Sequence, residues 1–369
     1  MSRLRVMVVE DSTMVRRMLT RTIDADPELQ LVGGAATVRA ALGKLAVLAP
    51  DVITLSPEMP AVNGTQTLRA LRKVAPGVPV IMISAQTERA ARLTLDALAA
   101  GARAFVTRPS GDGSAGRDAF RDQLLPRVRV LGHARRQALA GVAVPPVARP
   151  ASPLPPLPRA QDPIRLVVVA SGTGGPNALA DLVTSVPADF PVPILVVQHM
   201  PPVFTRVLAE RLQARCRVPV REATGGEALA GAGVFIAPGD HHLTVVREDS
   251  ELRLRLSQQP PENSCRPAAD VLFRSAAAAA GSGALAVVMT GLGQDGMRGA
   301  GAIRAAGGAV LAQDEASSLV WGMPGAIVHA GLADEILPLD RLGPFIARRA
   351  RRRAATVKPC NARHVTCAR

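Results

Sequence analysis

The stretch VVVASGTGGP, residues 167–176, constrains the fold of this chain more than any other segment. A continuous apolar run breaks abruptly into Ser171 and a glycine-rich turn that ends at Pro176. This pattern is typical of a buried strand that enters a tight turn and then a helix, because the first turn of a helix tolerates proline. In an open parallel sheet such a turn presents backbone N–H groups and small polar side chains over a crevice. We therefore expect a ligand-binding or active site at this edge.

Two later apolar runs also end in polar residues. ILVV is followed by Gln198 and His199, and LAVVMT is followed by a glycine-rich loop that contains Asp295. Ser171, His199 and Asp295 follow the chain order of one class of hydrolase triad, although geometry rather than order defines a triad. A dinucleotide site is the alternative interpretation. It fits less well, because GTGGPN lacks the third glycine and the next strand ends at His199 rather than at an acid.

Length and composition limit the classes of protein to consider. A chain of 369 residues with 48% hydrophobic residues suits two domains with substantial cores. No apolar run approaches the roughly 18 residues of a membrane span, and the N-terminus enters a strand without a signal peptide. We therefore expect a cytoplasmic protein without membrane insertion. The four cysteines have no CxxC or metal-ligand spacing, so we expect reduced thiols of minor structural role: Cys216, Cys265, Cys360 and Cys367.

The net charge of +14 raises the question of nucleic-acid binding. Arginine is spread along the whole chain, tyrosine is absent and aromatic residues make up 2%, so there is no stacking platform for single strands. No helix-turn-helix or zinc-finger spacing occurs. We expect no specific nucleic-acid binding, and attraction to acidic protein surfaces is equally compatible with the charge.

Residues 1–125 alternate between apolar runs and helical patterns in five units, which predicts a doubly wound parallel sheet of flavodoxin-like type. Polar residues follow the first, third, fourth and fifth strands, and these ends meet at the carboxyl edge where such folds bind ligands. The residues concerned are Glu10, Asp11, Ser56, Ser84, Thr107 and Arg108.

With this spacing the segment resembles the receiver domain of two-component response regulators. In that family a carboxylate pair holds Mg²⁺, a third-strand Asp accepts a phosphoryl group and a fifth-strand Lys contacts the phosphate. The resemblance places the metal pair at Glu10 and Asp11, the phosphoacceptor at Ser56 and the lysine position at Arg108. A solvated acidic loop is the alternative for the carboxylate pair.

The receiver resemblance also assigns switch positions to Ser84, Phe105 and Arg108. Ser56 brings no charge to Mg²⁺ and forms no acyl phosphate. We therefore expect a receiver that does not take phosphate in the ordinary way, with Mg²⁺ binding in doubt and Arg108 serving as a built-in counter-ion.

A proline-dense run between residues 141 and 163 predicts a solvated, semi-rigid linker, which we place at 126–162. A PxxP ligand is the alternative for this run. Residues 163–348 alternate again and predict a second doubly wound, Rossmann-like α/β domain. An arginine-rich run then predicts a basic C-terminal tail at 349–369, for which membrane or acidic-partner contact is unsupported.

Six motifs of this second domain resemble, in order, those of the chemotaxis protein-glutamate methylesterases (CheB family). They are TGGP at 173–176, QHMPP at 198–202, IAPGDHH at 236–242, RPAADVLFRS at 266–275, MTGLGQDG at 289–296, and AQDEASS with WGMP within 312–324. That family joins a receiver to a catalytic domain, and its unphosphorylated receiver occludes the catalytic face. It hydrolyses glutamyl methyl esters and deamidates glutamines on chemoreceptors. The resemblance implies methyl-accepting chemoreceptors and a chemotaxis histidine kinase as partners, and no cofactor for catalysis.

The resemblance assigns the base to His199 and the residue that orients it to Asp295. The family turn reads Gly-Ala-Ser-Thr-Gly-Gly, so the nucleophile position here is Gly172, which has no side chain. Adjacent side chains at a strand end point to opposite faces, so Ser171 should point away from His199. Ser171 acts as nucleophile only if the turn slips by one residue, which Gly172 makes sterically easier.

The oxyanion would be stabilised by the N–H groups of the glycine turn, with Thr173 and Gly174 at its centre. Three hypotheses follow. The first is a methylesterase and glutaminase that acts through Ser171, His199 and Asp295. The second is a pseudoenzyme that binds receptors or competes with an active paralogue. The third is a receiver-linked nucleic-acid binder.

Overall fold

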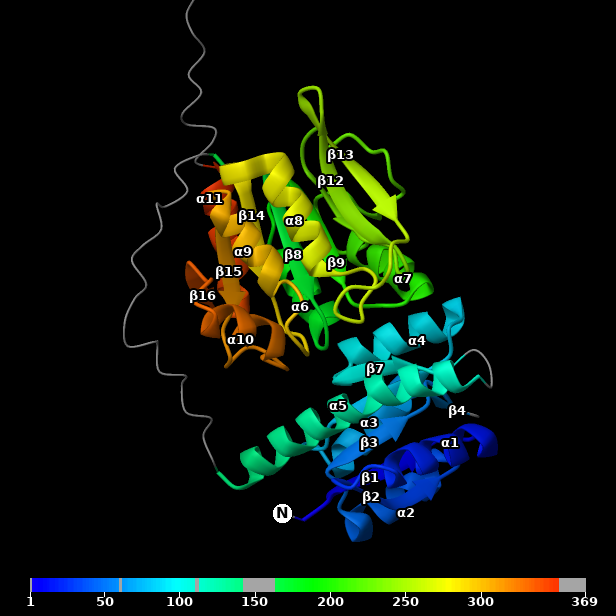
Figure 1. Cartoon of the computed structure of the whole chain (residues 1–369). Coiled ribbons are helices and arrows are strands. Elements are labelled where there is room, and N and C mark those ends of the chain that lie inside the picture. Colours follow the sequence, from blue (N-terminus) through cyan, green and yellow to red (C-terminus); the bar gives the residue numbers. More distant parts are fainter. Residues whose placement is uncertain (1, 60–61, 110–112, 142–162, 352–369) are drawn as a thin grey trace, which may run out of the picture.

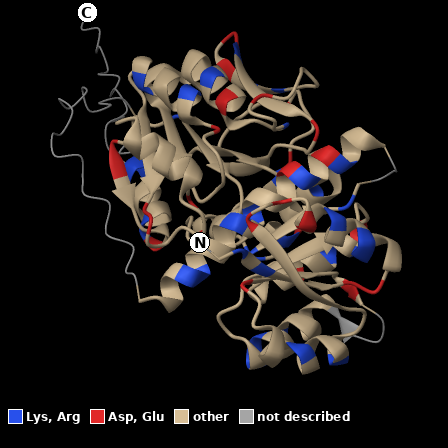
Figure 2. Ribbon diagram, turned by 60° about the horizontal axis from the view of Figure 1, so that its bottom comes forward, with Lys and Arg blue, Asp and Glu red and all other residues tan. Residues whose placement is uncertain are grey.

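The computed structural model describes residues 2–59, 62–109, 113–141 and 163–351, which form two α/β domains (Figure 1). Most of the expected proline-rich linker and of the basic tail lies outside the described residues. Within the described ranges, no helix combines the length and apolar character that crossing a membrane requires. Figure 2 shows basic and acidic segments interspersed over both domains.

The first domain is the predicted doubly wound sheet, with parallel strands in the order β2-β1-β3-β6-β7. Its elements are β1 (Leu4–Val9), α1 (Thr13–Asp24), β2 (Leu29–Ala35), α2 (Val38–Leu48), β3 (Val52–Leu55), the short β4 (Glu58–Met59) and β5 (Val62–Asn63), α3 (Gly64–Val74), β6 (Val80–Ser84), α4 (Glu88–Ala99), β7 (Ala104–Thr107) and α5 (Ser114–Leu139). Helices α1 and α5 cover one face, and α2, α3 and α4 cover the other. The central strands are mostly apolar because both faces of the sheet are covered by helices.

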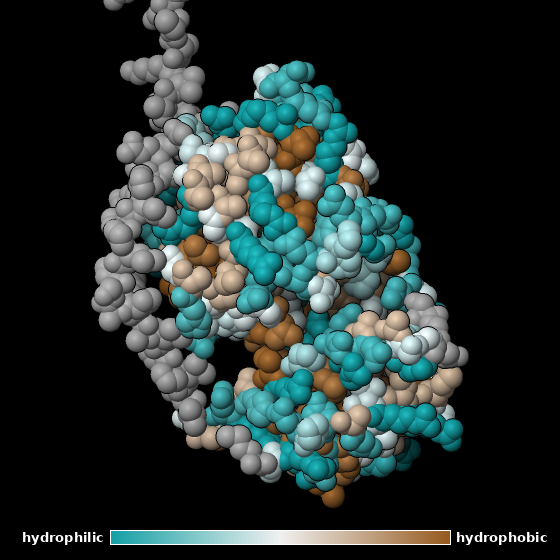
Figure 3. Space-filling view, in the orientation of Figure 1, coloured by the Kyte–Doolittle hydropathy of each residue, from teal (hydrophilic) through white to brown (hydrophobic). Residues whose placement is uncertain are grey.

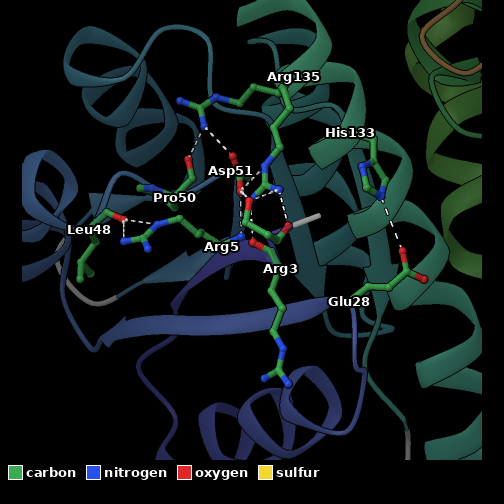
Figure 4. A network of polar contacts seen from close by, with 10 residues as sticks. Arg3, Arg5, Glu28, Leu48, Pro50, Asp51, His133 and Arg135 are labelled. Atoms are coloured by element: carbon green, nitrogen blue, oxygen red, sulfur yellow. Dashed lines mark hydrogen bonds and ion pairs between the residues drawn. The ribbon is translucent and has the colours of Figure 1, made fainter. Parts of the chain in front are cut away.

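Helix α5 is longer than the sequence indicates. The sequence analysis places the linker from residue 126, but α5 continues through Pro126 to Leu139. Its second half is held by polar contacts to the amino edge of the sheet. Arg135 Nη1 donates a hydrogen bond to Pro50 O at 2.6 Å (Figure 4). Arg136 Nη2 forms an ion pair with Asp51 Oδ2 at 2.6 Å. These tertiary contacts outweigh the hydrogen bond that proline removes, so residues 126–139 belong to the first domain.

The second domain carries a seven-stranded parallel sheet in the order β10-β11-β9-β8-β14-β15-β16. Its strands are β8 (Leu166–Ser171), β9 (Pro193–Gln198), β10 (Val220–Glu222), β11 (Gly233–Ile236), β14 (Ala284–Val288), β15 (Ala309–Gln313) and β16 (Glu335–Leu337), with a separate antiparallel hairpin of β12 (His242–Glu248) and β13 (Glu251–Ser257). One face is covered by α6 (Gly175–Thr184), α7 (Pro202–Gln213) and α11 (Leu339–Arg351), the other by α8 (Ala269–Ala280), α9 (Met297–Ala305) and α10 (Gly322–His329). The predicted Rossmann-like architecture is confirmed.

The first domain packs against the carboxyl edge of the second sheet, with α4 beside α7 (Figure 1). Three ion pairs join these helices: Arg92–Glu210 at 2.7 Å, Arg206–Glu88 at 3.0 Å, and Arg211–Asp96. Phe105 stacks on Phe204, with ring centroids 4.7 Å apart. Hydrophobic residues gather where the two domains meet (Figure 3), and one apolar cluster runs through both. Because exposed ion pairs contribute little individually, the apolar contact carries most of this interface.

Candidate active site

Three neighbouring strands bring the predicted site together. β8 lies between β9 and β14, and all three run parallel, so their carboxyl ends meet at one edge. Gly172 follows β8, His199 follows β9, and the loop with Asp295 follows β14. The alternating pattern of the sequence thus places these distant residues side by side, as expected for an open α/β sheet.

His199 and Asp295 form a hydrogen-bonded pair. The Nε2 atom of His199 lies 2.7 Å from Oδ2 of Asp295, and the Asp295 side chain is almost completely buried. The amides of Ala269 and Asp270, in the first turn of α8, donate to the same carboxylate at 2.6 and 3.1 Å. Asn263 Nδ2 also donates to it, at 2.8 Å. The carboxylate is therefore fixed by four donors, one of which is the imidazole.

The pKa values of both members of this pair are shifted in the direction that favours their ionised forms. Burial alone would disfavour imidazolium, but the hydrogen bond to Asp295 and the neighbouring Cys265 outweigh it and hold the pKa of His199 above its ordinary value. Burial likewise disfavours the Asp295 carboxylate, while the contact with His199 and the two α8 amides lowers its pKa below the usual range. The buried carboxylate therefore stabilises the imidazolium that forms when His199 takes up a proton.

Ser171 does not join this pair. Its side chain is fully buried, and its Oγ donates to Gln198 Oε1 at 2.7 Å. Gln198 Nε2 in turn donates to Gly172 O at 2.9 Å, which fixes the turn. The structure therefore shows no one-residue slip that would bring Ser171 to His199, and the strand alternation explains its orientation.

The position that faces the imidazole is Gly172. A Cβ atom built there would lie 3.4 Å from His199 Nδ1, 3.3 Å from Met323 Sδ and 3.1 Å from Gly291 Cα. The Nδ1 edge of His199 therefore faces the motif's nucleophile position, while Nε2 faces Asp295. No side chain fills that position in this chain.

Thr173 and Gly174 complete the turn. Thr173 O accepts a hydrogen bond from Thr290 Oγ1 at 2.9 Å, and Gly174 adopts a left-handed φ of 85° as the N-cap of α6. The Thr173 hydroxyl is buried and has no hydrogen-bond partner among the described residues. An unpartnered buried hydroxyl beside His199 suits a group that donates to a bound substrate oxygen.

Cys265 is the residue that sequence analysis missed, since we expected only a minor structural role for it. Its sulfur, a ring nitrogen of His199 and a carboxylate oxygen of Asp295 all lie within 4.8 Å of one another. The available signal was its place immediately before the RPAADVLFRS motif, whose residues 269 and 270 hold Asp295. Asn263, which also precedes this motif in the chain, was missed as well.

The receiver edge carries the other predicted residues. Glu10 is buried, its Oε1 accepts from Ser12 N at 3.0 Å and its Oε2 has no partner among the described residues. Burial raises the pKa of Glu10 to about 7. Asp11 is exposed and Ser56 is buried.

This receiver edge does not fit Mg²⁺ well. Mg²⁺ favours charged oxygen ligands in octahedral geometry. The edge offers Ser56 where a third carboxylate would stand, and burial disfavours the charged form of Glu10. The positive charge of Arg108 acts on Glu10 and lowers its pKa in part, as a counter-ion would.

The predicted switch residues connect this edge to the other domain. Ser84, at the end of β6, accepts a hydrogen bond at its Oγ from Thr94 Oγ1 of α4 at 2.8 Å, and Arg108 N donates to Ser84 O at 2.8 Å. Phe105, on the next strand, stacks on Phe204 of α7. The switch positions thus lie between the acidic edge and the domain interface.

A cavity at the domain interface contains the site. Gly172, Thr173 and His199 line it from the second domain, and Phe105 and Arg127 line it from the first. Burial lowers the pKa of the Arg127 guanidinium to about 10. The first domain therefore covers the His199 edge of the second.

A receiver-type sheet joined to a doubly wound domain with a buried His–Asp pair at a glycine turn defines a response regulator with a hydrolase effector domain. The sequence profile of the response regulator receiver domain matches residues 6–115, and that of CheB methylesterase matches residues 167–346. The chain belongs to the CheB methylesterase family.

Full-length relatives support this placement. Proteins named protein-glutamate methylesterase/protein-glutamine glutaminase are 48% identical in Nocardioides sp. and 43% identical in Trichodesmium erythraeum, over 97% and 95% of this chain and 99% of each relative. The CheB methylesterase catalytic domain of Thermotoga maritima superimposes with a TM-score of 0.50 at 38% identity, over 51% of this chain and 99% of that structure.

Proposed function

We propose that this chain hydrolyses glutamyl methyl esters and deamidates glutamines on methyl-accepting chemoreceptors in the cytoplasm. The observation that carries this proposal is the 2.7 Å contact between His199 and the buried Asp295 beside the glycine turn. The names of the full-length relatives support it, since they describe both reactions. No cofactor is needed, because the proton transfers involve only side chains of the chain itself.

The chemistry follows from the two edges of the imidazole. His199 takes a proton from the attacking group and passes it to the leaving methoxide or amine, while Asp295 fixes the tautomer and stabilises the imidazolium. The Thr173 hydroxyl and the amides of the turn stabilise the oxygen of the tetrahedral intermediate. All three parts lie at the same sheet edge.

The receiver domain controls access to the site. Phe105 and Arg127 occupy the side from which a receptor segment would reach His199. A methylated receptor helix is much larger than this cavity, so the first domain has to move away from α7 before turnover. A chemotaxis histidine kinase is the proposed upstream partner, acting through contact with the receiver.

Methanol release tests the proposed function. The full chain is mixed with membranes that carry receptors methyl-labelled on their glutamates, and volatile label is counted. We expect release above the buffer control, and a loss of about 10²-fold or more in His199→Ala, because the proton-transfer group is gone. Equal release by both proteins, or none by the wild type, would contradict the proposal.

The receiver is expected to form no acyl phosphate. Ser56 stands at the acceptor position, and a serine phosphate ester resists hydroxylamine, whereas an aspartyl phosphate does not. Labelled acetyl phosphate with Mg²⁺ should therefore leave no hydroxylamine-sensitive label on the full chain. Ser56→Asp is the matched variant, which restores the missing carboxylate. Stoichiometric hydroxylamine-sensitive label on the unaltered chain would show that another carboxylate accepts the group.

A further inference from the structure

We propose that Cys265 supplies the nucleophile that residue 172 lacks, so that the site acts through Cys265, His199 and Asp295. This inference rests on the proposed function and names the attacking atom within the same site. It starts from an incomplete site: the base, the residue that orients it and the oxyanion turn are assembled, but the position facing His199 Nδ1 is a glycine.

The neighbouring hydroxyls do not fill this gap. Ser171 is fully buried and its proton is committed to Gln198 Oε1. The Thr173 hydroxyl has no hydrogen-bond partner among the described residues, His199 included. Neither hydroxyl is therefore placed to pass its proton to the imidazole.

The sulfur of Cys265 lies near the pair. It is within 4.8 Å of a ring nitrogen of His199 and of a carboxylate oxygen of Asp295. Its influence on His199 is visible in the charge balance, because Cys265 stands next to Asp295 among the groups that raise the pKa of the imidazole. An imidazolium next to sulfur stabilises the negative charge of an attacking thiolate, which is how cysteine nucleophiles are activated.

The loop that carries Cys265 is fixed in place. The backbone of Cys265 exchanges two hydrogen bonds with that of Glu262, at 2.9 and 3.1 Å. The Glu262 carboxylate is held by both terminal nitrogens of Arg274, at 2.7 and 2.6 Å. Arg266, the next residue, donates to the carbonyls of Gln258 and Gln259 at 3.0 Å each. The sulfur is thus held near the imidazole by the folded loop, as preorganised catalysis requires.

The same three residues are also a conceivable metal-ligand set, but their hydrogen bonds favour a triad. Asp295 Oδ2 already accepts from His199 Nε2 and Ala269 N, and Oδ1 accepts from Asn263 Nδ2 and Asp270 N. A metal ion would have to displace the His199–Asp295 bond that defines the pair. A carboxylate that is hydrogen-bonded to an imidazole, with a thiol near that imidazole, is the arrangement of a cysteine hydrolase.

The reaction balances without any further reagent. The thiol proton goes to His199 as sulfur attacks the ester carbonyl carbon, and the tetrahedral intermediate expels methoxide, which takes that proton and leaves as methanol. A thioester joins the receptor glutamyl group to Cys265. Water then attacks the thioester carbonyl and gives a proton to His199, the carbon–sulfur bond breaks, and the thiolate is reprotonated as the glutamic acid leaves.

The experiment compares cysteine variants in the full chain. Methanol release from methyl-labelled receptor membranes is measured for the wild type, Cys265→Ala, Cys265→Ser and, as the matched control, Cys216→Ala. Cys216 is the other free cysteine among the described residues and lies outside the site. We expect a loss of about 10²-fold or more in both Cys265 variants and wild-type release from Cys216→Ala.

A second readout separates a catalytic role from a structural one. Reactions of the wild type are quenched in acid and digested, and the peptide containing residue 265 is examined by mass spectrometry. A receptor-derived adduct that neutral hydroxylamine removes is the expected result, because thioesters are cleaved under those conditions. The Gly172→Ser/Cys265→Ala double variant checks the fold, since its activity shows that the site survives the loss of the thiol.

The outcomes distinguish this inference from the proposed function. Unchanged release in both Cys265 variants, together with loss in His199→Ala, would overturn the role of Cys265 and leave the hydrolase intact. Release by Gly172→Ser but none by the wild type would overturn both for the native chain. Loss in both Cys265 variants together with the hydroxylamine-sensitive adduct supports the inference.

Discussion

In a Cys265→Ala background, Gly172→Ser is expected to raise methanol release from methylated receptors by about 10³-fold. The Cβ atom of residue 172 would stand 3.4 Å from His199 Nδ1, so a hydroxyl carried on it can lie within hydrogen-bond reach of the base. Gly172 is not among the glycines with a positive φ, so serine adopts this backbone without strain. The gain is large because the rest of the site is assembled.

Space decides whether this variant folds unchanged. The new Cβ would be 3.3 Å from the Met323 sulfur and 3.1 Å from Gly291 Cα, closer than most such contacts. Methionine adapts readily, while the Gly291 backbone has to yield by a few tenths of an ångström. Gly172→Ala is the matched control, since it adds the same Cβ without the hydroxyl. Equal gains from alanine and serine, or a gain that Ser171→Ala abolishes, would contradict the geometry.

The parts of this protein that sequence predicts are those that depend on periodicity. The continuous apolar runs of β8, β9 and β14 identify buried parallel strands, and the polar residues after them mark one sheet edge. The orientation of Ser171 followed from the two-residue repeat of a strand, and its bond to Gln198 agrees with that expectation. Local pattern was sufficient at each of these points.

Residues whose positions depend on long-range contacts were not predicted from the sequence. Cys265 lies in an irregular loop. Its approach to His199 depends on the backbone bridge to Glu262 and on Arg274, and no periodic pattern in the sequence predicts either contact. Helix α5 continues beyond Pro126 because Arg135 and Arg136 reach the amino edge of the sheet. A propensity-based boundary stops at the proline, whereas tertiary contact decides where the helix ends.

The packing of the two domains also depends on long-range contacts rather than on local sequence pattern. The pairing of Arg92 and Arg206 with their acidic partners joins the two domains, so it is defined only once both domains are folded. Phe105 was placed as a receiver switch residue, but its partner Phe204 sits in another domain. The covering of the site therefore depends on both folded domains, although the sequence predicts the residues that each domain contributes to it.

Asp295→Asn is expected to lower methanol release by roughly 10³- to 10⁴-fold, both in the native chain and in the Gly172→Ser variant. The carboxylate accepts four hydrogen bonds, two on each oxygen, and an amide has only one acceptor oxygen. Either orientation of the amide therefore sets its NH₂ group against two donors. His199 loses the partner that fixes its tautomer, so its Nδ1 no longer acts as a defined proton acceptor.

The pH profile provides an independent check on this effect. In the native chain the hydrogen bond and the charge of Asp295 raise the pKa of His199, so the imidazole stays protonated to higher pH than an isolated histidine. Removing that charge lowers the pKa, and the residual activity should follow a His199 titration displaced to lower pH. Asp334→Asn is the control, because Asp334 accepts a backbone bond from Val310 at 2.8 Å without contacting His199. A rate loss with no displacement of the titration would mean that Asp295 acts through the position of α8 rather than through its charge.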